Sequence, residues 1–227
     1  MSVTLIILTR NEIQGVAKVF PKIPVKKVDE VLVIDGQSKD GTAEFFRQKK
    51  MPVIVQEKLG RGEAFRIALK KAKCDNVIFF SPDGNENPSD IPKMADFLDK
   101  GFDLVIASRF IKGARADDHL QLVPYRGWGN RFFTGLSNFF FGGNLTDSIN
   151  GFRGVNKKKI SALHLDAQGF AIEYQMSMRA LKLGYKIKEF PTFEGDRIGG
   201  KSGAKTVDTG LYFVKMLLRE IGIGKRF

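Results

Sequence analysis

Residues 76–88 read NVIFFSPDGNENP, a short apolar run that passes directly into a polar segment around Asp83. The same order, apolar and then polar, recurs at residues 3–12 and 30–42. A short run rich in Val, Ile and Phe and bounded by turn residues is typical of a buried β-strand. These stretches therefore predict strands that each deliver polar side chains at their carboxyl ends.

The rest of the chain extends this pattern of strands and helices. Strands are expected at residues 3–8, 30–34, 53–56, 76–80, 103–107 and 186–190. Helices are expected at residues 13–20, 42–50, 63–73, 91–100, 171–183 and 206–221. Strands that alternate with helices predict an α/β fold, with a mostly parallel sheet covered on both faces. In such sheets ligands bind beyond the carboxyl ends of the strands.

The last expected helix, residues 206–221, is amphipathic. Its apolar face is formed by Val207, Leu211, Val214, Leu218 and Ile221. Such a face suits packing on the chain's own domain, on another subunit or in a membrane interface. We therefore expect one domain, residues 1–205, followed by a C-terminal amphipathic helix and tail, residues 206–227.

Composition narrows the classes of function. The chain has 227 residues and a formal net charge of +12, which favours anionic partners. The single cysteine, Cys74, excludes an intrachain disulfide, and two isolated histidines argue against a zinc site. The opening residues are expected to form a strand rather than an export signal. No stretch approaches the roughly 18 to 20 apolar residues that span a bilayer.

The polar segments, taken in order, resemble the motifs of family 2 glycosyltransferases, and most of all the dolichol- or polyprenyl-phosphate sugar synthases. The matching segments are residues 9–12, 35–42, 59–62, 81–88, 107–110, 147–153, 169–173 and 196–205. Each motif is weakly specific, but eight in order extend over nearly the whole chain to about residue 205. The resemblance implies a single-domain GT-A fold, Rossmann-like, with a central, mostly parallel mixed sheet.

The resemblance also implies an activity. It points to inverting transfer of a hexose from a nucleotide-sugar, of the GDP-mannose or UDP-glucose type, to a polyprenyl phosphate. The enzyme would work at the membrane surface, peripheral at the cytoplasmic face, directly or through a membrane-anchored partner. Its cofactor would be Mg²⁺ or Mn²⁺.

The donor side of this prediction has a physical basis. A divalent ion held by a carboxylate stabilises the charge that a leaving nucleoside diphosphate gains. Such ions prefer oxygen ligands, so Asp83, supported by Asn85, is the expected metal site. Ser81 stands where the family's metal motif has its first acidic residue. The nucleotide is expected to contact Thr9, Glu12, Asp35, Gly60 and Arg61.

The acceptor side is expected to be cationic, because an arginine fork donates two parallel hydrogen bonds to a phosphate. The resemblance assigns this role to Arg109, Arg126, Asn130, Arg197, Ser202 and Lys205, and Arg131 is a further candidate on the same chemical ground. Arg109 and Asp83 would act in catalysis. A phosphate acceptor needs no strong base, whereas a hydroxyl acceptor does, and Asp147 is the expected base in that case.

Two alternatives stay open from the sequence. One is a glycosyltransferase that acts on a glycan hydroxyl. The other is a non-catalytic nucleotide-sugar-binding subunit, which Ser81 favours because it removes a metal ligand. No nucleic-acid partner is expected, because many basic residues fall at strand ends beside acidic ones rather than on one exposed face.

Overall fold

The computed structural model describes residues 2–115, 124–199 and 206–227, with side chains for all of these except residues 124–126 and 206–208. Their strands form one seven-stranded sheet in the order β3-β2-β1-β4-β6-β5-β7. The strands are β1 Val3–Thr9, β2 Glu30–Asp35, β3 Val53–Val55, β4 Asn76–Phe80, β5 Leu104–Ser108, β6 Arg153–Asn156 and β7 Ile187–Pro191. The six predicted strands are confirmed.

Most of the sheet is parallel, as expected. β1 pairs in parallel with β2 and β4, β2 with β3, and β5 with β7. β6 runs antiparallel to both β4 and β5, which makes the sheet mixed. β6 was not predicted, because residues 153–156 (RGVN) contain a single large apolar residue and carry no strand signal of their own.

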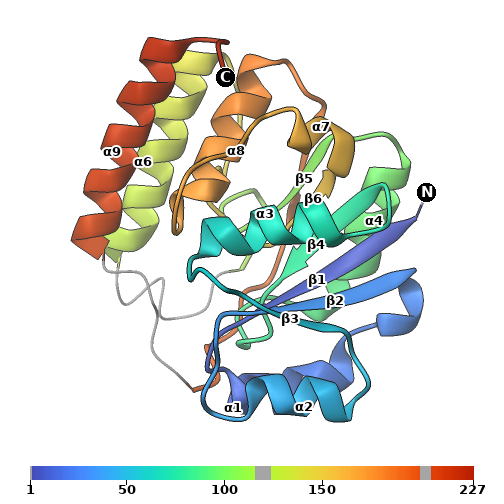
Figure 1. The fold of residues 1–227 in the computed structure, drawn as a ribbon. Coiled ribbons are helices and arrows are strands. Elements are labelled where there is room, and N and C mark those ends of the chain that lie inside the picture. The colour runs from blue at the N-terminus through green and yellow to red at the C-terminus, as the bar shows by residue number, and fades with distance from the viewer. Residues whose placement is uncertain (1, 116–123, 200–205) are drawn as a thin grey trace.

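Helices cover both faces of the sheet, as Figure 1 shows. The α-helices are α1 Ile13–Val19, α2 Thr42–Gln48, α3 Arg61–Lys71, α4 Ile91–Asp99, α6 Pro124–Phe141, α7 Lys157–Ser161, α8 Ala171–Lys182 and α9 Thr206–Ile223. Short 3₁₀ turns lie at Phe20–Lys22, Val25–Lys27 and Pro88–Asp90. The sequence did not predict α6, a helix rich in glycine and phenylalanine.

Alternate residues of each strand enter two separate cores, because side chains along a strand point to opposite faces. On β1, Ile6 and Leu8 pack with α3 and α8 residues, while Leu5 and Ile7 pack with residues of α1, α2 and α4. The sheet is therefore buried on both faces, which explains its continuous apolar strands.

α9 packs beside α6 and α8 and adds to the first of these cores (Figure 1). Phe213, Met216 and Leu217 are its buried apolar residues. The apolar face that the sequence indicated points the other way: Leu211, Val214, Leu218 and Ile221 are exposed. α9 is thus apolar on two sides, and docking to its own domain uses the side that helical periodicity did not single out.

Within the described residues, no helix is both long enough and apolar enough to cross a bilayer.

Candidate functional site

A cavity of about 680 Å³ lies at the carboxyl ends of β1, β2 and β4. The chain leaves β1 for β2 and β3 and then returns to β4 on the other side of β1. Such a reversal of strand order is where open α/β sheets bind ligands. Six predicted residues line this cavity: Thr9, Glu12, Gly60, Arg61, Asp83 and Arg197.

One wall of the cavity is apolar and suits the flat face of a nucleobase. It is formed by Leu8, Ile34, Leu59 and Ala64. The buried Gln56 lies beside it, and its Nε2 donates to the backbone oxygen of Gly60 at 2.9 Å. Gly60 has φ +147°, a conformation that favours glycine, and directly precedes α3.

Asp35 lies behind this cavity rather than on its wall. The residue is buried, and Ser38 donates to it from its backbone N at 2.9 Å and from its Oγ at 2.5 Å. Thr9 Oγ1 donates to the same carboxylate at 3.1 Å. These bonds hold the β1 and β2 strand ends together, and Asp35 is linked to the cavity wall through its partner Thr9.

The loop after β4 carries the oxygen atoms that suit a hard cation. Asp83 lines the cavity, and its Oδ1 accepts from the backbone N of Asn85 at 3.1 Å. The Asn85 Oδ1 atom is buried and has no hydrogen-bond partner in the described part of the chain. Those residues contain no cluster of three acidic, histidine or cysteine ligands. The donor set therefore fits Mg²⁺ or Mn²⁺ only where a diphosphate and water supply further ligands.

A second carboxylate backs this loop. Glu86 is buried, and its Oε2 accepts from the backbone N of Ser81 at 2.7 Å. Burial raises its pKa well above the usual value, and the nearby charge of Asp83 raises it further. Glu86 was not among the predicted site residues, although it lies in the 81–88 segment that resembles the family's metal-binding motif.

Arg197 connects residues predicted for different parts of the site. Its guanidinium lies 3.1 Å from Asp83 Oδ2 and also pairs with Glu12, a residue 185 positions away in sequence. Burial raises the pKa of Glu12 to about 7, Arg197 acts to lower it, and Asp83 to raise it. The structure thus brings a predicted acceptor residue into contact with one predicted nucleotide residue and with the predicted metal ligand.

Arg61 enters the cavity from the first turn of α3. It pairs with Glu173, a buried residue at the start of α8, and lies beside the rings of Phe65 and Phe170 at 5.6 and 5.5 Å. Gly151 leaves the space for this pair, because a Cβ there would collide with the guanidinium. The second oxygen of Glu173 is buried without a hydrogen-bond partner in the described residues.

Arg109, at the end of β5, is held in a fixed orientation. Its Nε and Nη2 donate to the two oxygens of Asp147 at 2.7 and 2.9 Å. Asp147 is fully buried and also accepts from the backbone N of Asn150 at 3.1 Å. Asp147, expected to act as a base toward a hydroxyl, is therefore engaged by Arg109.

Glu194, which was not predicted, is the third ionisable group here. Its carboxylate lies 3.9 Å from Arg109 Nη1 and accepts from Asn150 Nδ2 at 3.5 Å. It lies three residues after the end of β7 and three residues before the predicted Arg197. A site role for Glu173 and Glu194 could not be predicted from the sequence, because each is buried against a partner far away in the chain.

The remaining predicted residues lie on α6 or outside the description. Arg131 is exposed, and its guanidinium lies 5.1 Å from the Phe110 ring, which Arg109 also approaches at 5.3 Å. Arg131 and Arg109 thus flank one ring, and Asn130, next to Arg131 on α6, is half-buried. The side chain of Arg126, and both Ser202 and Lys205, lie outside the described residues.

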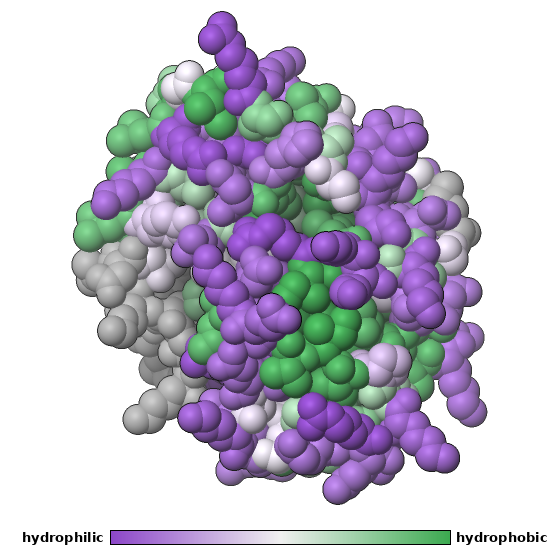
Figure 2. Space-filling model, in the orientation of Figure 1, coloured by the Kyte–Doolittle hydropathy of each residue, from purple (hydrophilic) through white to green (hydrophobic). Residues whose placement is uncertain are grey.

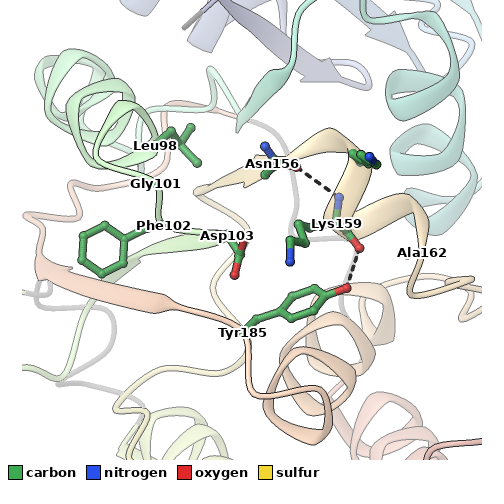
Figure 3. Close-up of a pocket in the computed structure, with 9 residues that line it drawn as sticks. Leu98, Gly101, Phe102, Asp103, Asn156, Lys159, Ala162 and Tyr185 are labelled. Carbon is green, nitrogen blue, oxygen red and sulfur yellow. Dashed lines mark hydrogen bonds between the residues drawn. The ribbon is translucent and has the colours of Figure 1, made fainter.

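A second hollow opens at the opposite edge of the sheet, between α4, β5 and α7 (Figure 3). Its polar groups already bond to one another. Asn156 Oδ1 accepts from the backbone N of Lys159, and the Tyr185 hydroxyl donates to the backbone oxygen of Lys159 at 3.0 Å. Asp103 Oδ2 accepts from the backbone N of Lys186. This hollow is therefore a weaker candidate for a ligand site than the cavity beside Asp83.

The model of glycosyl transferase family 2 matches residues 4–163. The chain belongs to that family. Its curated relatives include the glycosyltransferase AglJ of Haloferax volcanii, 32% identical over 81% of this chain and 60% of that protein. This chain therefore spans less than two thirds of AglJ. The dolichyl-phosphate hexose transferase of the same organism is 28% identical over 84% of this chain and 82% of that protein.

Another relative is the undecaprenyl-phosphate mannosyltransferase of Micrococcus luteus, 28% identical over 89% of this chain and 87% of that protein. Among solved structures, a glucosyl-3-phosphoglycerate synthase from Mycobacterium tuberculosis superposes with a TM-score of 0.77. That match covers 97% of this chain and 80% of that chain at 18% identity, so it bears on the fold alone. That enzyme was solved with Mn²⁺, uridine diphosphate and glucosyl-3-phosphoglycerate. The predicted α/β GT-A fold is confirmed.

Proposed function

We propose that this glycosyltransferase moves a hexose, with inversion, from a nucleoside diphosphate sugar to a polyprenyl phosphate, with Mg²⁺ or Mn²⁺ as cofactor. The donor would occupy the cavity beside Asp83. The acceptor phosphate would lie beside Arg109 and Arg131. The reaction would take place at the cytoplasmic face of a membrane.

The Arg109–Asp147 pair is the observation that carries the proposal. Both oxygens of Asp147 face Arg109, so the group offered at this place is an oriented cation rather than a free base. Glu194 is likewise within 3.9 Å of Arg109. A phosphate acceptor is already anionic and needs a cation to position it, whereas a hydroxyl acceptor needs a base to remove its proton.

The residues of this chain would divide the chemistry between them. Asp83, with the Asn85 oxygen, would hold the divalent ion, which when bound neutralises charge on the departing diphosphate. Arg61 lines the same cavity and would add positive charge to the diphosphate. Arg109 would hold the acceptor so that its oxygen meets the anomeric carbon on the face opposite the leaving group.

The lipid character of the acceptor is supported by two further observations. Two relatives carry dolichyl phosphate or undecaprenyl phosphate in their names. In addition, α6 and α9 expose large apolar side chains, and an exposed apolar patch of this kind marks an interaction surface. These residues, the α6–α9 surface below, are Trp128, Phe132, Phe139, Leu211, Val214 and Leu218.

The test is transfer of radiolabelled sugar by the purified chain. UDP-glucose and GDP-mannose would each be offered with Mn²⁺ and, in separate reactions, polyprenyl phosphate, 3-phosphoglycerate or a free glycan. We expect labelled lipid, loss of label with a chelator, and loss of activity in Asp83→Ala. Asp96→Ala, an exposed carboxylate on α4, is the matched control. Label in phosphoglycerate or glycan alone, or full activity of Asp83→Ala, would overturn the proposal.

A further inference from the structure

Arg197 occupies the place on Asp83 that the proposed metal would need. Its Nη1 lies 3.1 Å from Asp83 Oδ2, and the same guanidinium pairs with Glu12. No other ion pair to Glu12 or Asp83 occurs in the described chain. A buried carboxylate without a cation is costly, so Arg197 serves as the counter-ion of both groups when no donor is bound.

The segment that carries Arg197 is attached directly to the candidate metal loop. The backbone N of Ile198 donates to the backbone oxygen of Asp83 at 2.7 Å. The backbone N of Gly195 donates to the backbone oxygen of Asn85 at 2.9 Å. Gly84 permits this approach, because a Cβ there would lie 2.7 Å from Ile198 and 2.8 Å from the oxygen of Asp196. Arg197 is therefore placed by the loop whose carboxylate it covers.

The ion pair is incompletely satisfied. Arg197 Nε and Glu12 Oε2 are both buried without a hydrogen-bond partner in the described residues. Glu12 itself is only 9% exposed and lines the donor cavity. Buried polar atoms without partners cost free energy, so this arrangement leaves room for a ligand to improve on it.

We infer that Arg197 and the metal of the donor compete for Asp83, and that Arg197 is the residue through which donor binding promotes acceptor binding. A divalent ion on Asp83 would repel the guanidinium from its present position. Released from Asp83, Arg197 becomes available to an anionic acceptor. This inference rests on the proposed function. It has Arg197 pair first with Asp83 and then with the anionic acceptor.

Binding of Mn²⁺ alone to the nucleotide-free protein tests the competition without any transfer reaction. We expect Arg197→Met to bind Mn²⁺ roughly tenfold more tightly than wild type, measured from the electron paramagnetic resonance signal of free Mn²⁺, because a competing cation has been removed. Arg10→Met is the matched control, since Arg10 lines the same cavity without an ion pair to Asp83 or Glu12 in the described residues. An unchanged affinity in Arg197→Met, or an equal gain in Arg10→Met, overturns the inference.

The order of binding has its own measurement. We expect a short-chain polyprenyl phosphate to bind wild type more tightly when Mn²⁺ and the nucleoside diphosphate are present, and Arg197→Met to lose that gain. Hydrogen exchange in wild type is the check that needs no variant: the Ile198 amide should exchange faster once Mn²⁺ and nucleotide are added. Equal acceptor affinity with and without donor, or unchanged exchange at Ile198, contradicts the inference even if transfer activity is intact.

Discussion

Glu194 shows how burial acts on a single carboxyl group near the candidate acceptor site. Burial raises its pKa from 4.5 to about 7, Arg109 acts to lower it, and the charges of Asp147 and Asp83 raise it. The folded protein therefore keeps a proton on Glu194 at pH values where the unfolded chain has released it. Stability from this group is complete below about pH 4.5 and is lost as the pH rises through 7.

Replacing Glu194 by Gln should flatten the pH dependence of stability. The amide stays neutral, so the variant lacks the loss that wild type suffers as Glu194 ionises in the folded state. We expect the fall in unfolding free energy between about pH 5 and about pH 7.5 to shrink by roughly 1–3 kcal/mol in Glu194→Gln. Urea denaturation at the two pH values measures this, and an identical fall in both proteins would contradict it.

Asp147→Asn distinguishes a positioning residue from a base. Breaking the buried pair with Arg109 should cost about 3–5 kcal/mol of stability. In the folded fraction we expect the KM for polyprenyl phosphate to rise roughly tenfold while kcat changes less, because the guanidinium is misplaced rather than a proton acceptor lost. Steady-state kinetics across pH checks this. A collapse of kcat at unchanged KM would instead make Asp147 the base.

Among the helices, α9 owes its attachment to one buried carboxylate as well as to apolar packing. Glu220 is fully buried and accepts from Arg179 at 2.8 Å and from Lys182 at 2.6 Å, both on α8. The ring of Phe227 then lies 4.4 Å from the Arg179 guanidinium. Because Glu220, Arg179 and Lys182 are buried together, their pairing fixes the orientation of α9 on α8.

Removal of that carboxylate should loosen the helix. We expect Glu220→Gln to lower the unfolding free energy by about 3–5 kcal/mol, because Arg179 and Lys182 remain buried with less compensation. Arg219→Gln is the control: it breaks an exposed pair with Asp166 and should cost less than about 1 kcal/mol. Denaturant titration of both variants gives the comparison, and equal losses would refute a special role for Glu220.

Across the whole molecule, charge and apolar exposure coincide on the α6–α9 surface. Figure 2 shows hydrophobic side chains at the left edge of the view, where α9 stands in Figure 1, among strongly hydrophilic ones. Lys215, Arg219, Lys225 and Arg226 are exposed on the same helix and tail. With a net charge of +12, this combination suits an interface with anionic lipids.

The α6–α9 surface should therefore bind vesicles. We expect sedimentation with vesicles that contain anionic lipid, weaker binding at high salt, and a loss of roughly tenfold in the double variant Leu211→Ser/Leu218→Ser. Val55→Ser, an exposed apolar residue on β3, is the matched control. If the wild-type protein does not sediment with vesicles, this result would point to a membrane-anchored partner on this surface instead.

The sequence alone determined six of the seven strands, the parallel α/β plan and six of the residues that line the cavity beside Asp83. It could do so because apolar runs report burial locally, and because parallel strands bring their carboxyl ends to one edge. Strand ends placed Asp83, Glu12 and Thr9 at this edge, and the resemblance to family 2 glycosyltransferases added Arg61. The distances between these residues were not predicted.

Only the tertiary structure decided what these residues contact. β6 forms because β4 and β5 offer hydrogen bonds on both of its sides, not because residues 153–156 favour a strand. Arg197 pairs with Glu12, 185 positions away in the sequence, and Arg109 pairs with Asp147, the residue expected to act as a base. Local patterns carry the preference of each segment for burial, whereas the pairing of charges depends on which segments the packed core brings together.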